Sequence, residues 1–255
     1  MRRKSNIYGS CFFELIEAGS STSASAIVPE VVRLTAPNSV IDVGCGVGSW
    51  LVAAQQAGIT DIVGIDGYYV PRERVRIPIQ CFEPRDLSLP LQLTRRFDLA
   101  MCLEVAEHLP ESRADSLVSD LVGAADAVLF SAAIPGQFGT GHINEQWPDY
   151  WAKQFLRHKY FALDVLREQF WNREDVETHY KQNCVLYLNE RAYAQFLSQK
   201  AAVRDGNVRR LVHPTLYTVY MNISHPFSAL RFRSRRGISG WVPDSVRRAR
   251  RRLMP

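Results

Sequence analysis

The hydrophobic residues of the chain fall into short apolar runs separated by segments with helical spacing. Seven runs predict buried strands, at residues 39–43, 61–65, 81–82, 97–103, 127–133, 161–166 and 184–188. Apolar residues three and four positions apart predict helices over about residues 111–124 and 148–159. Strands that alternate with helices predict an α/β fold with a Rossmann-like, doubly wound sheet, whose ligands bind outside the carboxyl ends of the strands.

The segment before the first strand is predicted to form two short helices, at residues 12–18 and 26–35, joined by a polar turn at residues 19–25. We expect residues 1–36 to fold over the ligand at the sheet edge. No apolar run reaches the roughly 18 to 20 residues of a membrane span. The start of the chain also lacks the apolar segment of a signal peptide, so we expect a cytoplasmic protein.

Basic charge is concentrated in the extension that follows the α/β domain, which we place at residues 37–200. Residues 231–255, within the extension at residues 201–255, contain nine arginines and one aspartate, whereas the rest of the chain contains 22 basic and 25 acidic residues. The body is therefore slightly acidic, which argues against a nucleic-acid groove across the domain. The arginine-rich tail could bind an anionic membrane surface, at the inner face, or a protein partner. In the alternative, it is a solvated tail that binds neither.

The first strand leads into a glycine turn, Val-Ile-Asp-Val-Gly-Cys-Gly-Val-Gly, at residues 40–48. Gly44, Gly46 and Gly48 let backbone N–H groups and the start of the next helix approach a ligand closely, which favours a nucleotide-type site. The turn alone would also suit a nicotinamide or flavin cofactor. Asp66, at the end of the second strand, can accept both hydrogen bonds of a ribose diol.

The order of these motifs resembles that of the class I S-adenosylmethionine-dependent methyltransferases, over about residues 35–190. The resemblance implies a seven-stranded sheet with the last strand antiparallel. It also implies that Asp66 binds the ribose of S-adenosylmethionine and that Asp86 with Leu87 binds the adenine. The full set of expected cofactor-binding residues is Asp42, Gly44, Gly46, Gly48, Trp50, Asp66, Asp86, Leu87 and Glu104.

A Glu-x-x-Glu-His segment stands at the end of the fourth strand, as Glu104, Glu107 and His108. Carboxylate and imidazole donors suit Mg, Mn, Fe or Zn, and His142, in the loop after the neighbouring fifth strand, can complete the set. The segment resembles the metal-binding segment of ubiquinone-biosynthesis O-methyltransferases and of small-RNA 2′-O-methyltransferases. In the alternative without a metal, these side chains cap the helix or line the pocket, and His142 or His108 is the candidate general base.

The loop after the fifth strand and the helix that follows it suggest an acceptor site. Asn144 and Glu145 can bond hydroxyl groups, and Trp147 and Trp151 offer aromatic faces to a sugar ring. In the other interpretation, the two tryptophans pack the helix onto the core. The segment also resembles one in bacterial methyltransferases associated with glycans and surface polysaccharides.

These observations favour an O-methyltransferase, metal-assisted, that acts on a hydroxyl of a sugar or glycan in polysaccharide biosynthesis. A metal there would hold a vicinal diol or catechol by two oxygens and lower the pKa of the attacking one. The alternatives are 2′-O-methylation of an RNA end, methylation of a catechol-like small molecule, and a cofactor-binding protein without catalysis. The acidic body makes RNA the weaker alternative.

Overall fold

The computed structural model describes residues 10–199 and 208–224 of the 255-residue chain. The chain divides into two compact units, Met1–Leu216 and Tyr217–Pro255. Of the second unit only residues 217–224 are described, and they belong to helix α8 (Pro214–Ser224). The arginine-rich tail, and with it the predicted membrane or partner contact, lies outside the described residues. Within the described ranges, no helix combines the length and apolar character of a bilayer span.

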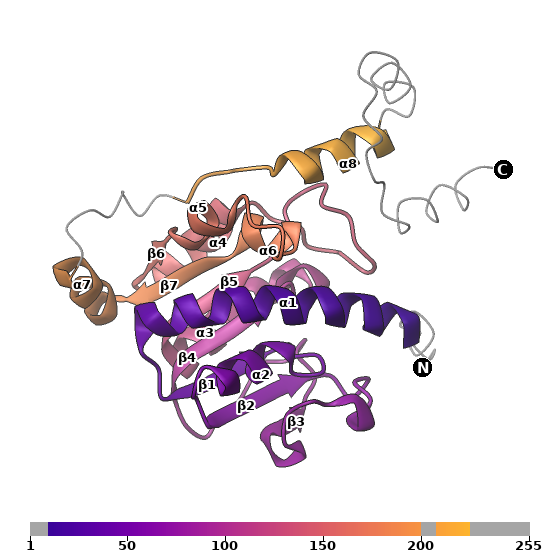
Figure 1. Cartoon of the computed structure of the whole chain (residues 1–255). Helices are drawn as coiled ribbons and strands as arrows, with labels where there is room; N and C mark the ends of the chain where they lie inside the picture. Colours follow the sequence, from indigo (N-terminus) through magenta and orange to yellow (C-terminus); the bar gives the residue numbers. More distant parts are fainter. Residues whose placement is uncertain (1–9, 200–207, 225–255) are drawn as a thin grey trace. The chain divides into compact units, whose positions relative to one another are not determined.

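The first unit is built on one seven-stranded sheet. Figure 1 shows how its strands and helices are arranged. Its strand order is β3-β2-β1-β4-β5-β7-β6. All neighbouring pairs from β3 to β5 are parallel, whereas β7 runs antiparallel to both β5 and β6. The predicted α/β fold with an antiparallel last strand is confirmed. The strands are β1 (Ser39–Val43), β2 (Asp61–Asp66), β3 (Phe82–Pro84), β4 (Phe97–Leu103), β5 (Ala125–Ser131), β6 (Tyr160–Leu163) and β7 (Val185–Asn189).

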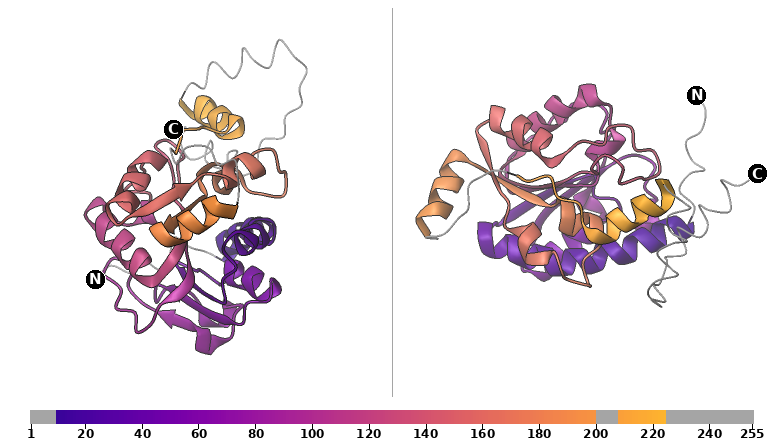
Figure 2. Two further views of the ribbon diagram at one scale, coloured as in Figure 1. Left: turned by 90° about the vertical axis from the view of Figure 1, so that its left-hand side faces the viewer. Right: turned by 90° about the horizontal axis from the view of Figure 1, so that it is seen from above.

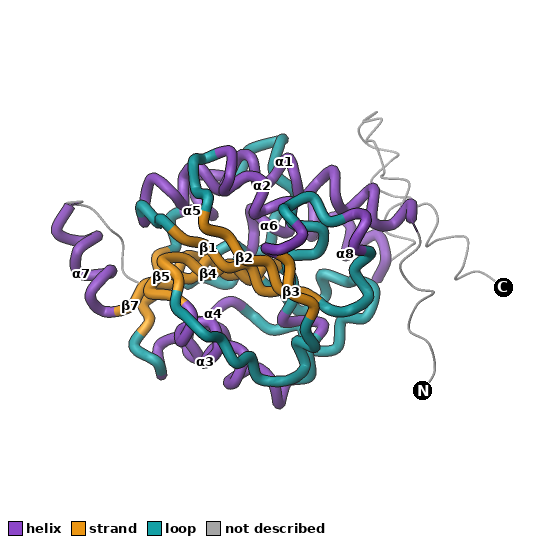
Figure 3. Tube along the Cα trace, turned by 90° about the horizontal axis from the view of Figure 1, so that it is seen from below, coloured by secondary structure: helices purple, strands orange, loops and turns teal. Residues whose placement is uncertain are grey.

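Helices cover both faces of the sheet (Figures 2 and 3). Successive strand residues point to opposite faces, so Val40 joins one apolar core and Ile41 the other. The first core packs against α1 (Ser10–Thr35), α2 (Ser49–Gln56), α5 (Leu166–Phe170) and α6 (Thr178–Asn183). The second packs against α3 (Ala114–Ala124) and α4 (Pro148–Arg157). Helix α7 (Glu190–Gln199) follows β7.

The predicted polar turn at residues 19–25 is wrong, because α1 is one continuous helix of 26 residues. The hydroxyls of Thr22 and Ser25 bond to the carbonyls of residues 18 and 21, four positions earlier, and so remain compatible with a helix. Gly19 packs closely against Glu177, since a Cβ there would lie 2.6 Å from the Glu177 carboxylate. The packing of α1 against the rest of the domain therefore outweighs the turn propensity of its serine-rich segment, residues 19–25.

Two later boundaries also differ from the predictions. Strand β6 ends at Leu163, and the chain then forms α5, because Leu166 and Phe170 turn into the first core. The segment between the predicted strands at residues 161–166 and 184–188, for which the sequence pattern indicates no regular element, ends in α6, which begins at Thr178. Helix α6 brings Tyr180 and three following polar residues to buried positions beside the sheet. This placement matters for the site below.

Candidate functional site

The glycine turn connects β1 to α2 at the carboxyl edge of the sheet. The backbone N–H of Gly44 donates to the carbonyl of Ile65 at 2.7 Å, which ties the turn to β2. Gly44 has φ +87°, and a Cβ there would lie 2.2 Å from Cγ2 of Val105. Gly48, with φ +92°, begins α2 without a side-chain cap. The N–H groups of the first turn of α2 therefore remain available to a ligand.

Asp66 lies at the end of β2 beside this turn and is 3% exposed. Its Oδ2 accepts the backbone N–H of Gly46 at 2.6 Å, and its Oδ1 accepts the N–H of Gly67 and the hydroxyl of Tyr69, both at 2.6 Å. Burial raises the pKa of Asp66, although these three donors oppose the rise. The structure thus places the predicted ribose-binding carboxylate next to the glycine turn.

The two other aspartates of the expected cofactor set differ in environment. Asp42 is 1% exposed, and its Oδ2 has no hydrogen-bond partner among the described residues. Burial, and then the nearby Asp66, raise the pKa of Asp42 well above its usual range. Asp86 is exposed and accepts bonds from the backbone and hydroxyl of Ser88 at 2.9 and 2.7 Å, while Leu87 is buried.

Arg113 fixes the loop that follows β3, a role that the sequence did not indicate. This arginine is 4% exposed and donates to the carbonyls of Leu87 and Leu89 at 3.2 and 3.0 Å. It also pairs with Asp120 of α3, whose carboxylate accepts the N–H of Leu91 at 2.9 Å. The pair holds the expected adenine-binding residues against α3, so Arg113 is a positioning residue.

Glu104 ends β4 in a left-handed conformation, with φ +55°. Its carboxylate accepts the side-chain amide of Gln137 at 2.7 Å and that of Asn183 at 3.1 Å. The amide of Asn183 also donates to Gln137 at 2.8 Å. Gln137 and Asn183 were missed in the sequence, because they lie 33 and 79 positions from Glu104 and belong to no spaced motif. Two side-chain amides therefore fix the position of the Glu104 carboxylate.

Trp50 and Tyr180 form the wall beside Glu104. Their rings meet edge to face with centroids 4.9 Å apart, and both side chains are buried. The hydroxyl of Tyr180 bonds with that of Ser20 at 3.0 Å. Through Tyr180, Trp50 therefore links the start of α2 to α6 and α1.

Glu107, His108 and His142 form a group whose possible ligand atoms all lie within 4.8 Å of one another. Glu107 is fully buried, and neither carboxylate oxygen has a hydrogen-bond partner among the described residues. Burial, and then Glu104, raise the pKa of Glu107 well above its usual range. The backbone carbonyl of Glu107 accepts the N–H groups of Ile143 and Asn144, at 2.8 and 3.1 Å, which binds the loop after β5 to this turn. Glu104 stands outside this three-residue group.

The two histidines of the group are oriented by the loop. The rings of His108 and His142 meet edge to face, with centroids 4.9 Å apart. Nδ1 of His142 bonds with Glu145 at 2.9 Å, which leaves its Nε2 for another partner. Loss of hydration, followed by the neighbouring His142, lowers the pKa of His108. Neutral imidazole, with one ring nitrogen fixed by a hydrogen bond, is the form that binds metal ions.

Glu145 organises the loop after β5. Besides His142, it accepts the backbone N–H groups of Gly136 and Phe138 at 2.7 and 3.2 Å. Its three partners all belong to residues 136–142, so this carboxylate closes the loop on itself. These three bonds leave one lone-pair position of the carboxylate, so the contact of Glu145 with a substrate hydroxyl stays a prediction.

Three further residues were predicted to contact the acceptor, and the structure buries two of them. Trp151 is 2% exposed and packs against Phe130 in the second core, so it presents no face to a sugar ring. Asn144 is 4% exposed and bonds internally with Gln146 at 3.1 Å. Trp147 is half-buried, with the guanidinium of Arg210 centred 5.5 Å from its ring. Sequence proximity to His142 placed Trp151 in the site, whereas its position on α4 turns it into the core.

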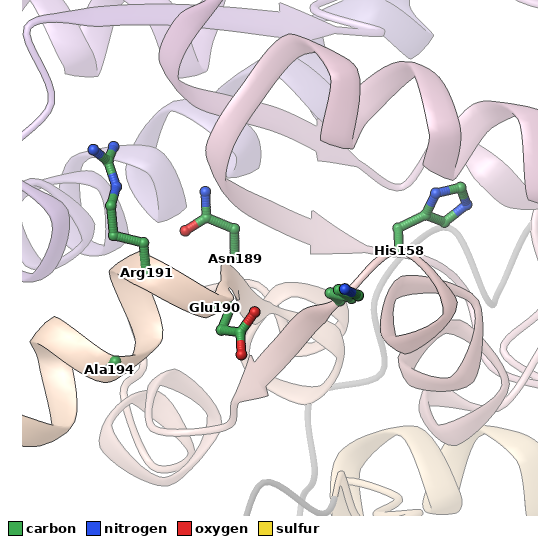
Figure 4. Close-up of a pocket in the computed structure, with 6 residues that line it drawn as sticks. His158, Asn189, Glu190, Arg191 and Ala194 are labelled. Atoms are coloured by element: carbon green, nitrogen blue, oxygen red, sulfur yellow. The ribbon is translucent and has the colours of Figure 1, made fainter.

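A shallow hollow of about 470 Å³ lies at the opposite end of the sheet, on the side where the parallel strands begin (Figure 4). His158 and Lys159 border it just before β6, and Asn189 to Arg191 border it at the end of β7. Since β7 runs antiparallel to β5, its end lies where the parallel strands begin. This hollow is therefore separate from the glycine turn and the histidines.

Comparison with known proteins agrees with this fold. Residues 21–133 match a family model described as a methyltransferase domain. The chloroplastic magnesium protoporphyrin IX methyltransferase of Arabidopsis thaliana is 27% identical over 114 residues. That match covers 42% of this chain and 36%, just over a third, of the length of the plant protein.

Solved structures share the fold at low sequence identity. The sugar N-methyltransferase KedS8 from Streptoalloteichus has a TM-score of 0.54 at 13% identity, covering 74% of this chain and 98% of that chain. A putative O-methyltransferase from Nostoc punctiforme has a TM-score of 0.53 at 13% identity, covering 70% and 59%. The methyltransferase domain of bacterial CtHen1 has a TM-score of 0.50 at 21% identity, covering 67% and 98%. Residues 21–133 therefore resemble a methyltransferase domain, and the solved structures share the fold of the sheet that carries the glycine turn.

Proposed function

We propose that this protein is an S-adenosylmethionine-dependent O-methyltransferase, metal-assisted, that methylates a hydroxyl of a sugar or glycan. The observation that supports this most directly is the position of two sites at one sheet edge. The glycine turn and Asp66 follow β1 and β2, whereas Glu107, His108 and His142 follow β4 and β5. A methyl donor and an acceptor bound at these neighbouring places would meet, and methyl transfer depends chiefly on such positioning.

The proposed cofactor site uses backbone and carboxylate groups already described. Asp66 would accept the ribose hydroxyls, and the uncapped start of α2 would lie beside the rest of the ligand. Asp42 is buried, and its Oδ2 has no partner in the described part of the chain, so it would accept the amino group of the methionine part. Leu87 would pack on the adenine, with Asp86 at its rim, and Glu104 with Trp50 would bound the inner side.

Glu107, His108 and His142 fit a divalent metal. A fully buried carboxylate without hydrogen-bond partners is costly unless a cation or proton neutralises it. Glu107, His108 and His142 would be the protein ligands, and Glu145 would orient His142. A bound divalent cation would lower the pKa of an acceptor hydroxyl. Glu104 is held by Gln137 and Asn183, so it would act on the cofactor side.

The exposure of the group favours a hydrophilic acceptor. His108 and residues 138–141 are exposed, so the cluster opens to solvent and not into an enclosed apolar pocket. Neighbouring sugar hydroxyls match such an open site with oxygen-binding ligands. The slightly acidic body of the chain opposes the polyanion of an RNA end. Trp147, at the start of α4, is the remaining aromatic candidate for contact with a sugar ring.

Cofactor binding is tested by calorimetric titration with S-adenosylhomocysteine. We expect wild-type protein to bind one equivalent, and Asp66→Asn to bind about tenfold more weakly, since one charge-assisted hydrogen bond is worth roughly 1.5 to 3 kcal/mol. Asp98→Asn, at the other end of the sheet, is the matched control and should bind like the wild type. Wild-type protein that does not bind S-adenosylhomocysteine would refute the proposed function.

The acceptor is tested by methyl transfer from labelled S-adenosylmethionine to parallel panels. One panel contains sugar nucleotides and oligosaccharides, a second contains RNA oligonucleotides with a free 3′ diol, and a third contains catechols. We expect label in the first panel, with the product alkali-stable as an ether is. Label confined to the second or third panel would replace the sugar acceptor with the corresponding alternative.

A further inference from the structure

The exposed Tyr69 contacts Asp66, the carboxylate that we propose binds the ribose. Its side chain is 62% exposed, yet its hydroxyl donates to Oδ1 of Asp66 at 2.6 Å. The ring lies directly over Gly67, where a Cβ would be 2.2 Å from Cε1 of Tyr69. The ring therefore takes this position only because residue 67 is a glycine.

The acceptor capacity of Asp66 is nearly full. A carboxylate has about four lone-pair positions, two on each oxygen. The N–H of Gly67 and the hydroxyl of Tyr69 use both positions on Oδ1, and the N–H of Gly46 uses one on Oδ2. One position remains, whereas a ribose diol that donates both hydroxyl hydrogens needs two. The Gly46 and Gly67 donors belong to the backbone of the turns, so Tyr69 holds the donor that can leave.

We propose that the hydroxyl of Tyr69 competes with the ribose diol for Asp66, so that Tyr69 must swing outward before the cofactor is fully bound. This inference rests on the proposed function, because it assumes that Asp66 receives the ribose. The outward movement needs no change in the core, since the ring is mostly exposed and belongs to the turn after β2. Tyr69 is thus a gate residue. The apparent association constant for the cofactor equals the intrinsic constant multiplied by the fraction of molecules in which Tyr69 has moved outward.

Tyr69→Phe tests the gate, because it keeps the ring and removes the competing hydroxyl. We expect S-adenosylhomocysteine to bind about three- to tenfold more tightly than to wild-type protein, as the closed form loses its hydrogen bond. In stopped-flow measurements the gain should appear in the association rate, with the dissociation rate unchanged, because the bound state lacks the Tyr69–Asp66 bond. Tyr68→Phe is the matched control: Tyr68 is the neighbour in the chain, is 77% exposed, and should show wild-type binding.

The outcomes separate this inference from the proposed function. Equal binding by Tyr69→Phe and wild-type protein would show that the hydroxyl does not compete, and the gate would be refuted while cofactor binding stands. Weaker binding by Tyr69→Phe, with a faster dissociation rate, would show that Tyr69 contacts the bound cofactor, which also refutes the gate. Absence of binding by wild-type protein would refute the proposed function itself. Folding of the variant is checked by circular dichroism.

Discussion

Gly44→Ala is expected to lower the free energy of unfolding by about 3 kcal/mol and to abolish detectable binding of S-adenosylhomocysteine. Two costs add at this position. Gly44 has φ +87°, which costs an alanine about 1 to 2 kcal/mol. The new Cβ would lie 2.2 Å from Cγ2 of Val105, and overpacking of this kind costs about 1 to 3 kcal/mol. Relief of the clash would move Val105 or the turn, and with it the N–H groups that face the ligand.

Gly46→Ala is the matched control for this prediction. Gly46 also has a positive φ, +55°, but a Cβ there would meet no atom within 4 Å. We therefore expect only the backbone strain, about 1 kcal/mol. Urea unfolding followed by circular dichroism measures both variants, and calorimetry measures the affinity. Equal destabilisation by the two substitutions would mean that the contact with Val105 does not constrain the turn.

Glu107→Gln is expected to eliminate divalent metal binding and to reduce methyl transfer at least about 100-fold, as removal of the metal with EDTA should also do. The substitution keeps the shape of the side chain but removes the charge that a cation needs. Glu107 is fully buried without hydrogen-bond partners among the described residues, so its charge destabilises the metal-free fold. The melting temperature of the metal-free variant should therefore equal or exceed that of metal-free wild-type protein.

Titration with Mn²⁺ and Zn²⁺ measures the metal site directly. We expect one site in wild-type protein and none in Glu107→Gln, while Glu111→Gln, exposed in the following turn, keeps the site. If neither chelation nor Glu107→Gln changes the activity, the metal hypothesis is wrong, and His142 or His108 becomes the candidate general base. Loss of activity without loss of metal binding would assign Glu107 to another role.

The sequence was sufficient where the placement of a residue follows from local order along the chain. Glycines directly after an apolar run place a turn at the carboxyl end of a strand, and an aspartate that ends the next strand lies beside it. The same reasoning brought Glu107, His108 and His142 together, because parallel neighbours β4 and β5 end at one edge. Such predictions depend on strand period and strand polarity, which adjacent residues determine.

Tertiary structure decided which atoms each side chain contacts. The segment of α1 that is rich in hydroxyl side chains remains helical because one side of that helix packs on the core. Trp151 packs inward against Phe130. Glu104 is held by Gln137 and Asn183, partners 33 and 79 positions away that no spacing in the sequence marks. The chain's own pattern thus predicted the fold, which the structure confirms. It also indicated the cofactor edge and the candidate metal residues, which stay predictions. Which side chains are buried, shared or free depends on packing between distant segments, and only the folded structure sets that packing.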